Sequence, residues 1–275
     1  MSLIKTSKQV ELMAESGRIL REIILRMVAI ATPGVTTQAI DDHARALCKE
    51  YAVTPGFFGY GVAGKKYPAV SCLSVNDAIV HAIPTERPLQ DGDVLGIDMG
   101  VVYKGWNSDS AVTVVISHGN QSSLSTDRAT YSLAPSRSEK FASGLQQRLR
   151  LVEVTRDAMY LGIAQAVPGN HVGDIGHAVQ KYVEAQGFGV IRDLVGHGIG
   201  KKLHEEPRIP NYGLPGEGHE LKVGMVICIE PMVSVGDWKL VLDADGWTYR
   251  TKDGSLGAHF EHTLAITKDG PVVLT

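Results

Sequence analysis

The stretch DGDVLGIDMGVVYKGWNSDSAVTVVI, residues 91–116, contains two apolar runs, each with an aspartate inside it. Short apolar runs that begin at an Asp-Gly turn are typical of β-hairpins, so the stretch predicts two neighbouring strands. Asp98 and Asp109 then lie on adjacent strands of one sheet. Burying an ionised carboxylate without a partner costs several kcal/mol, and few Lys or Arg residues in these runs could pair with the two aspartates.

The same conflict between charge and burial recurs in the C-terminal half of the chain. Glu230 lies in MVICIEPMV and Glu261 in AHFEHTLAI, both strand-like apolar segments. A single carboxylate in such a run could be a strand-end cap or half of a salt bridge, but four of them favour a shared ligand. Carboxylates with one imidazole, which His197 can supply, form a hard ligand set suited to one or two divalent metal ions.

The histidines of this chain allow several interpretations. Residues 196–207, GHGIGKKLHEEP, are not the His-Glu-x-x-His helix of zinc proteases, because the residue four positions after His204 is Arg208. Ordinary loop histidines remain an alternative for His197 and His204. His81, in VNDAIVHAIP, is either a hydrogen-bonded core residue or an acid beside the metal site. The residues alone do not decide which histidines are metal ligands.

Helical segments occur twice in a similar order. A capping box at Thr6 to Gln9 starts an amphipathic helix that ends at Pro33-Gly34, and a second amphipathic helix follows. Helical periodicity returns at about 148–167, is broken by Pro168-Gly169 and resumes over 172–187. The repetition predicts an α/β (α+β) chain with two similar halves, each of two helices and a sheet, and a site where the halves meet.

Length, composition and charge limit the class of protein. A chain of 275 residues with 44% hydrophobic content is long enough for one large single-core domain or for two small ones, and the repeated halves favour a single domain over residues 1–275. Residues 117–147, which are Ser-rich, are not expected in the core. The net charge of -3 argues against nucleic acid or acidic membranes as main partners. Cys48, Cys72 and Cys228 lie far apart, which argues against a disulfide framework or a structural zinc site. Without a signal peptide or membrane span, the chain is expected in the cytoplasm.

Ordered motifs over almost the whole chain resemble those of the methionine aminopeptidases. They are KTSKQVELM, PGVTTQAID, SVNDAIVHAIP, DGDVLGIDMG, DLVGHGIGKKLHEEP, GMVICIEPMV and FEHT. The resemblance implies the pita-bread fold with pseudo-twofold halves. The 25 residues between His204 and Glu230, residues 205–229, leave no space for the helical insertion of type II enzymes, so the chain is similar to the bacterial type I. Residues 117–147 resemble an insertion found in some Gram-positive bacteria.

The resemblance also implies the activity and the residues that perform it. The family removes the initiator methionine from nascent proteins and peptides whose second residue is small, by attack of a metal-bridged hydroxide on the methionyl carbonyl. It uses two divalent ions, with Co, Mn, Fe(II), Zn and Ni all possible. Motif by motif, the implied metal ligands are Asp98, Asp109, His197, Glu230 and Glu261, with Asp109 and Glu261 bridging. The implied catalytic residues are His81, His204 and Glu230, and the implied substrate-binding residues are Tyr67, Cys72, His81, Leu203, His204 and Trp247.

Partners, departures and rival functions complete these expectations. A peptide or nascent-chain N-terminus is the expected partner, with transient ribosome association, and a monomer is expected.

His259 stands where the family has glutamine, two residues before Glu261, so the surroundings of the metal site are expected to differ. The rivals are an Xaa-Pro peptidase of the same fold, which would be expected to carry a large N-terminal domain, and a non-catalytic pita-bread binding protein, which would be expected to lack some ligands.

Overall fold

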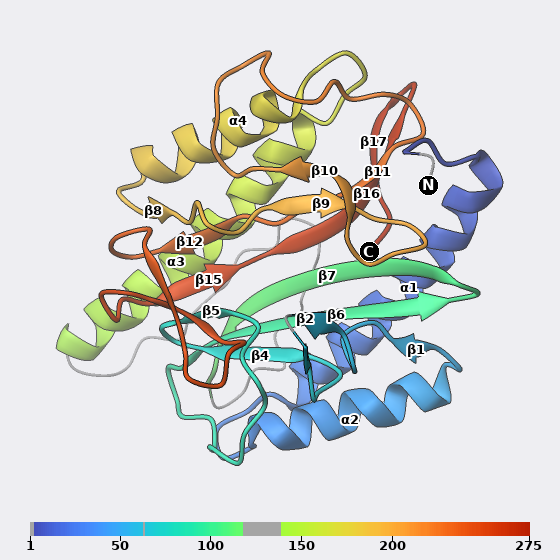
Figure 1. The fold of residues 1–275 in the computed structure, drawn as a ribbon. Coiled ribbons are helices and arrows are strands. Elements are labelled where there is room, and N and C mark those ends of the chain that lie inside the picture. Colours follow the sequence, from blue (N-terminus) through green and yellow to red (C-terminus); the bar gives the residue numbers. More distant parts are fainter. Residues whose placement is uncertain (1–2, 63, 118–138) are drawn as a thin grey trace.

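The computed structural model describes residues 3–62, 64–117 and 139–275, and its centre is a curved antiparallel sheet of nine strands (Figure 1). Seven strands follow one another across this sheet in the order β1 (Thr54–Pro55), β6 (Val94–Tyr103), β7 (Trp106–Val115), β16 (Glu261–Thr267), β11 (Val226–Ile229), β9 (Gly196–Gly198) and β10 (Glu205–Ile209). Two more strands pair beside this path: β4 (Cys72–Val75) with β6, and β17 (Gly270–Val273) with β16.

Smaller sheets flank the central one. One has three strands, β15 (Gly257–His259), β12 (Met232–Ser234) and β8 (Gly189–Val190). A second has three strands, β13 (Leu240–Leu242), β14 (Tyr249–Thr251) and β5 (Ala78–Val80), and a two-stranded hairpin joins β2 (Gly61–Val62) to β3 (Lys65–Lys66). These additions surround the site described below with short strands and loops.

Two helix pairs cover the sheet, one pair for each half of the chain (Figure 1). The first pair is α1 (Ser7–Ile30) and α2 (Thr37–Glu50); the second is α3 (Glu139–Ala164) and α4 (Val172–Ala185). The predicted capping box is confirmed, because the Thr6 hydroxyl accepts from the backbone N–H of Gln9 while the Gln9 side chain accepts from the backbone of Thr6. Apolar helix faces and the sheet form the cores.

The junctions between the paired helices show that the two halves are built alike. Gly34 and Gly169 both adopt left-handed backbone conformations, with φ of 92° and 90°. The Gly34 N–H donates to the carbonyl of Leu89 at 2.8 Å, and the Gly169 N–H donates to that of Leu221 at 3.0 Å. A central strand follows each of these leucines within a few residues, β6 in one half and β11 in the other. The predicted repetition of two αα-plus-antiparallel-sheet halves is therefore confirmed.

The halves join through one pair of strands in the middle of the sheet. Glu261 of β16 lies opposite Ala111 of β7, and His262 lies opposite Ser110. Because both strands belong to the same antiparallel sheet, each half contributes side chains to one shared face. The predicted meeting place of the halves is thus a continuous sheet surface.

Some element boundaries differ from those predicted. The third helix already includes Glu139, the first residue described after the gap, and not only residues from about 148 on; Leu145, before the predicted start, packs against the core of the second half. Of the predicted Ser-rich segment 117–147, residues 118–138 lie outside the described residues. Glu230 lies between β11 and β12 and not within a strand.

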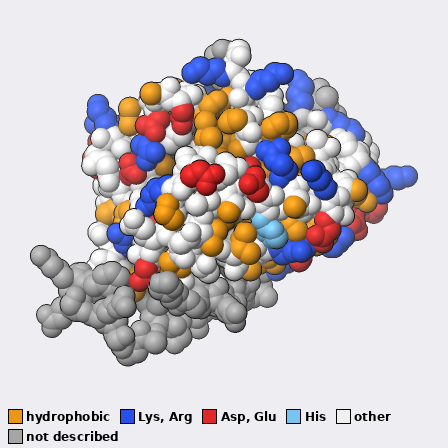
Figure 2. All heavy atoms as spheres, turned by 90° about the horizontal axis from the view of Figure 1, so that it is seen from below, with side chains coloured by type: hydrophobic (Ala, Val, Ile, Leu, Met, Phe, Trp, Pro, Cys, Tyr) orange, Lys and Arg blue, Asp and Glu red, His pale blue; other side chains and the backbone are white. Residues whose placement is uncertain are grey.

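The surface seen from the side of α2 carries mixed charge. Acidic and basic side chains are interspersed there with scattered hydrophobic ones (Figure 2). Among the helices of the described residues, none combines the length and the apolar character needed to cross a bilayer.

Candidate metal centre

Three of the predicted ligands share a face of the central sheet because of strand register. Asp98 of β6 and Glu261 of β16 both lie directly opposite Ala111 of β7, one on each side. Asp109 precedes Ala111 by two residues, and side chains two apart on a strand point to the same face. Ligand-type oxygens of Asp98, Asp109 and Glu261 accordingly lie within 4.8 Å of one another. The fold converts three distant acidic residues into one cluster.

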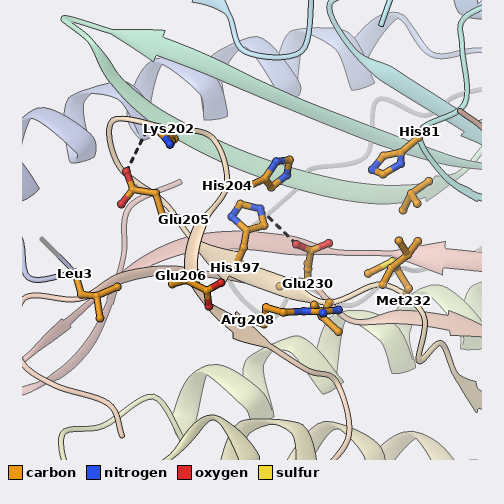
Figure 3. A pocket seen from close by; sticks show the side chains of 14 residues that line it. Leu3, His81, His197, Lys202, His204, Glu205, Glu206, Arg208, Glu230 and Met232 are labelled. Carbon is orange, nitrogen blue, oxygen red and sulfur yellow. Dashed lines mark hydrogen bonds and ion pairs between the residues drawn. The ribbon is translucent and has the colours of Figure 1, made fainter. Parts of the chain in front are cut away.

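His197 reaches this cluster from β9, which packs tightly between β10 and β11. A Cβ at Gly196 would collide with the carbonyl oxygen of Cys228, and one at Gly198 with that of Glu206, so the glycines on both sides of His197 permit this close packing. The His197 Nε2 lies 3.5 Å from Glu230 Oε1 (Figure 3). It also lies 3.9 Å from an oxygen of Asp109 and 3.9 Å from one of Glu261. The structure thus brings all five predicted ligands together.

The cluster contains polar atoms that no protein group satisfies. Within the described residues, the buried side-chain atoms without a hydrogen-bond partner include Asp98 Oδ1, Glu261 Oε1 and His259 Nε2. Unpaired buried carboxylate oxygens are costly, and folded proteins rarely keep them without a ligand. Oxygen-rich donors with one imidazole nitrogen match divalent first-row metal ions. The residues therefore fit the metal ions that the ligand pattern implied.

Electrostatics in the cluster lead to the same conclusion. Burial, with repulsion from Asp109, raises the pKa of Asp98, Glu230 and Glu261 well above the usual range. Burial raises the pKa of Asp109 to about 7, although the backbone N–H of Ser110 opposes the shift. Four carboxylates so close together resist ionisation in the absence of a cation, and a divalent ion would remove that resistance.

Two further side chains, Cys228 and His259, lie beside the proposed ligands. Cys228 lies within metal-ligand distance of His197 and Glu261, but burial raises the pKa of its thiol far above neutrality. Its Sγ lies 3.4 Å from Thr263 Oγ1, so the thiol is hydrogen-bonded directly beside the cluster. His259, on β15, is buried and directs Nε2 to within 3.7 Å of Glu230 Oε2.

The two other predicted histidines lie at the rim of the cluster. His81 follows β5 with a left-handed φ of 58°, a conformation that non-glycine residues adopt rarely. The His204 ring makes an edge-on contact with that of His197, with centroids 4.4 Å apart. Burial and the nearby His204 lower the pKa of His81 to about 4, and burial lowers that of His204 as well. Both rings are neutral at pH 7.

An aromatic cavity of about 180 Å³ adjoins the carboxylates. All four apolar residues expected to bind substrate line it, namely Tyr67, Cys72, Leu203 and Trp247. The Tyr67 and Trp247 rings meet edge to face, 5.3 Å between centroids. Phe57 and Tyr60 also line the cavity and were not predicted. They belong to a turn-rich segment, FFGYG, whose aromatic residues were the only sequence signal.

A wider cavity of about 580 Å³ leads from the rim to solvent (Figure 3). His81, His197, His204 and Glu230 form its inner part. The exposed charged side chains of Lys202, Glu206 and Arg208 also line it, whereas Met232 is a buried part of its wall. The metal cluster therefore lies between a narrow apolar cavity and an open channel, an arrangement that can hold one end of a chain while the remainder extends outward.

Comparison with known proteins gives the same family throughout. The sequence profile of metallopeptidase family M24 matches residues 11–268. A methionine aminopeptidase of Clostridium acetobutylicum is 40% identical over 276 aligned positions, which cover 100% of this chain and 99% of that protein.

Solved structures are similar over the full chain. The crystal structure of methionine aminopeptidase from Thermotoga maritima aligns with a TM-score of 0.86 and 38% identity, covering 99% of this chain and 98% of that one. The prolidase of Pyrococcus horikoshii shares only the fold, with a TM-score of 0.72 at 20% identity over 63% of its length. The chain therefore belongs to metallopeptidase family M24 and, within that family, to the methionine aminopeptidases.

Proposed function

We propose that this protein removes the N-terminal methionine from peptides and proteins whose second residue is small. The observation that carries the proposal is the junction of the apolar 180 Å³ cavity with the carboxylate cluster. Methionine is unbranched and flexible, and its thioether makes favourable contacts with aromatic rings such as those of Tyr67 and Trp247. The bond to be cleaved would then lie beside the cluster.

We further propose that the five clustered side chains hold two divalent metal ions. Asp98, Asp109, His197, Glu230 and Glu261 would hold the ions. When bound, such ions lower the pKa of a coordinated water to about 7, which supplies a nucleophile at neutral pH. The donor set suits Co, Mn, Fe(II), Zn and Ni, because all are divalent first-row ions that accept oxygen and nitrogen ligands, and metal availability helps to decide which ion occupies such a site.

Three side chains have proposed roles in the chemistry. Glu230 accepts the proton that the attacking water loses, and its position beside the rim supports this role. His204 donates a hydrogen bond to the methionyl carbonyl oxygen as negative charge develops on it. His81 hydrogen-bonds the amide that is cleaved. Both histidines line the two cavities, and each neutral ring carries one N–H for donation.

The proposal extends to the setting in which the enzyme acts. The natural substrates would be nascent chains. The enzyme would act as a monomer in the cytoplasm and would reach these chains through transient association with ribosomes. The open outer channel supports a polypeptide substrate, since residues after the second can extend along it. Sedimentation of the purified protein, alone and with ribosomes, would test the oligomeric state and the association.

Metal reconstitution tests the main proposal. We expect the chelated protein to release no methionine from Met-Ala-Ser and to regain activity when Mn²⁺, Fe²⁺ or Co²⁺ is added. An Xaa-Pro peptide, assayed in parallel, should remain intact. Activity that persists after complete chelation would contradict the metal proposal, and preferential cleavage of the Xaa-Pro peptide would favour a prolidase-like function.

A further inference from the structure

His197 and His204 are neighbours of the same chemical type with different expected tasks. Their rings meet edge-on, and both rings lie within ligand distance of Asp109. A neutral imidazole carries one N–H and one lone pair, and which nitrogen carries the hydrogen decides whether Nε2 can bind a metal or donate a hydrogen bond. The partner of Nδ1 sets that choice in each ring.

For His197, the Nδ1 partner is a backbone carbonyl. His197 Nδ1 lies 2.9 Å from the carbonyl oxygen of Gly198. A carbonyl oxygen only accepts, so Nδ1 carries the hydrogen and Nε2 keeps its lone pair. That lone pair is directed at the oxygens of Glu230, Asp109 and Glu261. This tautomer is the one that binds a metal.

For His204, the Nδ1 partner is a phenol. His204 Nδ1 lies 2.7 Å from Tyr60 Oη, and the two rings meet edge to face with centroids 5.2 Å apart. A phenol is a good donor and a poor acceptor, whereas the bare nitrogen of a neutral imidazole is a good acceptor. The favourable arrangement is therefore O–H of Tyr60 donating to Nδ1. The hydrogen of His204 then resides on Nε2.

We propose that Tyr60 is a positioning residue that holds His204 in the Nε2–H tautomer, opposite to that of His197. The hydrogen on Nε2 removes His204 from the set of metal ligands and makes it the donor to the substrate carbonyl. The inference rests on the proposed function, which assigns that donation to His204. It explains why one ring of an adjacent pair binds metal while the other meets substrate.

The location of Tyr60 connects this role with substrate binding. Its ring lines the apolar cavity proposed for the methionine side chain, while its hydroxyl holds His204 at the cavity mouth. His204 is directed into the space above His197 (Figure 3). One side chain thus forms part of the cavity wall and fixes the ring orientation of the donor, so the donor is aligned before the substrate arrives.

The test compares two phenol–imidazole pairs. Tyr60→Phe keeps the ring and removes the hydroxyl. The matched control is Tyr160→Phe, since Tyr160 Oη lies 3.5 Å from His262 Nε2, and neither residue lines the two cavities. Protein labelled with ¹⁵N-histidine and loaded with diamagnetic Zn²⁺ would be examined by NMR. The His204 signal, one of those from ten histidines, is identified by its loss in His204→Gln.

We expect a protonated, pyrrole-type Nε2 and a hydrogen-bonded, pyridine-type Nδ1 for His204 in the native protein. Tyr60→Phe should shift the Nδ1 signal, whereas Tyr160→Phe should not. For Met-Ala-Ser, the kcat of Tyr60→Phe should fall about 10-fold, with KM changed less than about 3-fold. Removing a hydrogen-bond donor to the oxyanion lowers kcat about 10²- to 10³-fold, and a donor that is only misaligned should lower it less. The control should keep native kcat.

Two results would overturn the inference. One is a protonated Nδ1 on His204 in the native protein, and the other is a Tyr60→Phe variant with the spectrum and kcat of Tyr160→Phe. Failure of the proposed function would look different. If no form of the protein releases methionine, the proposed function is refuted, but the nitrogen shifts still show which tautomer His204 adopts.

Discussion

Buried carboxylates occupy two contrasting surroundings in this molecule. Asp93, at the turn before β6, accepts hydrogen bonds from the Arg87 guanidinium at 2.8 and 3.1 Å, from the Gln90 backbone at 2.8 Å and from Asn76 at 2.8 Å. These bonds hold the pKa of Asp93 below its usual range although burial acts in the opposite direction. Asp41 on α2 is similar, because its Oδ1 accepts from two backbone N–H groups and a hydroxyl.

The clustered carboxylates of the central sheet have few such donors. Asp98 Oδ1 and Glu261 Oε1 have none among the described residues, and the pKa of each of these side chains is raised by burial and by Asp109. The two groups of carboxylates differ in how many hydrogen-bond donors surround them, and this difference matches different roles. A carboxylate with donors on every oxygen stabilises the fold, whereas a carboxylate with vacant lone pairs is held by the fold for a ligand. Substitutions in the two regions should therefore have opposite consequences.

The largest expected effect is that of Glu230→Gln on catalysis. We expect turnover of Met-Ala-Ser to fall about 10²- to 10⁴-fold, since an amide neither accepts a proton nor carries the ligand charge. The melting temperature of the metal-free variant should not fall, because the change removes one of several mutually repelling carboxylates. Calorimetry and peptide assays measure both. Near-native turnover, or a marked loss of metal-free stability, would show that Glu230 stabilises the fold as Asp93 does and is not held for a ligand.

The pH dependence of stability should differ in sign between the two regions. In the metal-free protein, the raised pKa of Asp109, about 7, makes the native state bind a proton that the unfolded state does not between about pH 7 and pH 4. The free energy of unfolding should therefore rise as pH falls through this window. The rise should shrink in Asp109→Asn when urea unfolding is measured. Unchanged behaviour in that variant would refute the assignment.

For Asp93 the sign is reversed, because its folded pKa is lowered. Its contribution is complete above about pH 4, the usual pKa of an unfolded aspartate, and is lost as pH falls through the lower folded value. Asp93→Asn should lower the free energy of unfolding at pH 7 by about 1 to 2 kcal/mol, with turnover near native. Asp269→Asn, at an exposed turn, is the control and should change stability by less than about 0.5 kcal/mol. Equal effects of the two variants would contradict the structural role of Asp93.

The smallest expected effect is that of His259→Gln, at a residue that belongs to neither group of carboxylates. His259 Nε2 is buried, has no hydrogen-bond partner among the described residues and lies 3.7 Å from Glu230 Oε2, so a small movement would let this imidazole contact a proposed ligand. We expect His259→Gln to weaken Mn²⁺ binding about 10-fold in calorimetric titration. Identical affinities in the variant and the native protein would show that His259 acts on packing alone.

Sequence patterns anticipated much of the fold because local rules govern it. The capping box at Thr6, the Pro-Gly junctions and the apolar spacing of the helices are all decided within a few residues. The hairpin that carries Asp98 and Asp109 is also local, since one short turn fixes its register. Acidic residues inside apolar runs identified the carboxylates, because burial without partners needs an explanation.

Contacts between distant segments were not predictable from such patterns. Tyr60 and His204 are 144 positions apart, and no periodicity connects them. Phe57 was missed for the same reason. The closeness of Cys228 to the cluster was not predicted either, because it follows only from the pairing of β11 with β16.

The sequence by itself therefore determined which residues have chemistry that burial must explain, and which segments are helices and strands. Tertiary structure alone decided that Asp98 and Glu261 lie on either side of Ala111 and that His197 enters from a third strand. It also decided that His197 Nδ1 meets the carbonyl oxygen of Gly198 and that His204 Nδ1 meets the hydroxyl of Tyr60. The physical reason is that propensity and periodicity act over a few residues, whereas strand order and hydrogen-bond partners depend on packing of the whole chain.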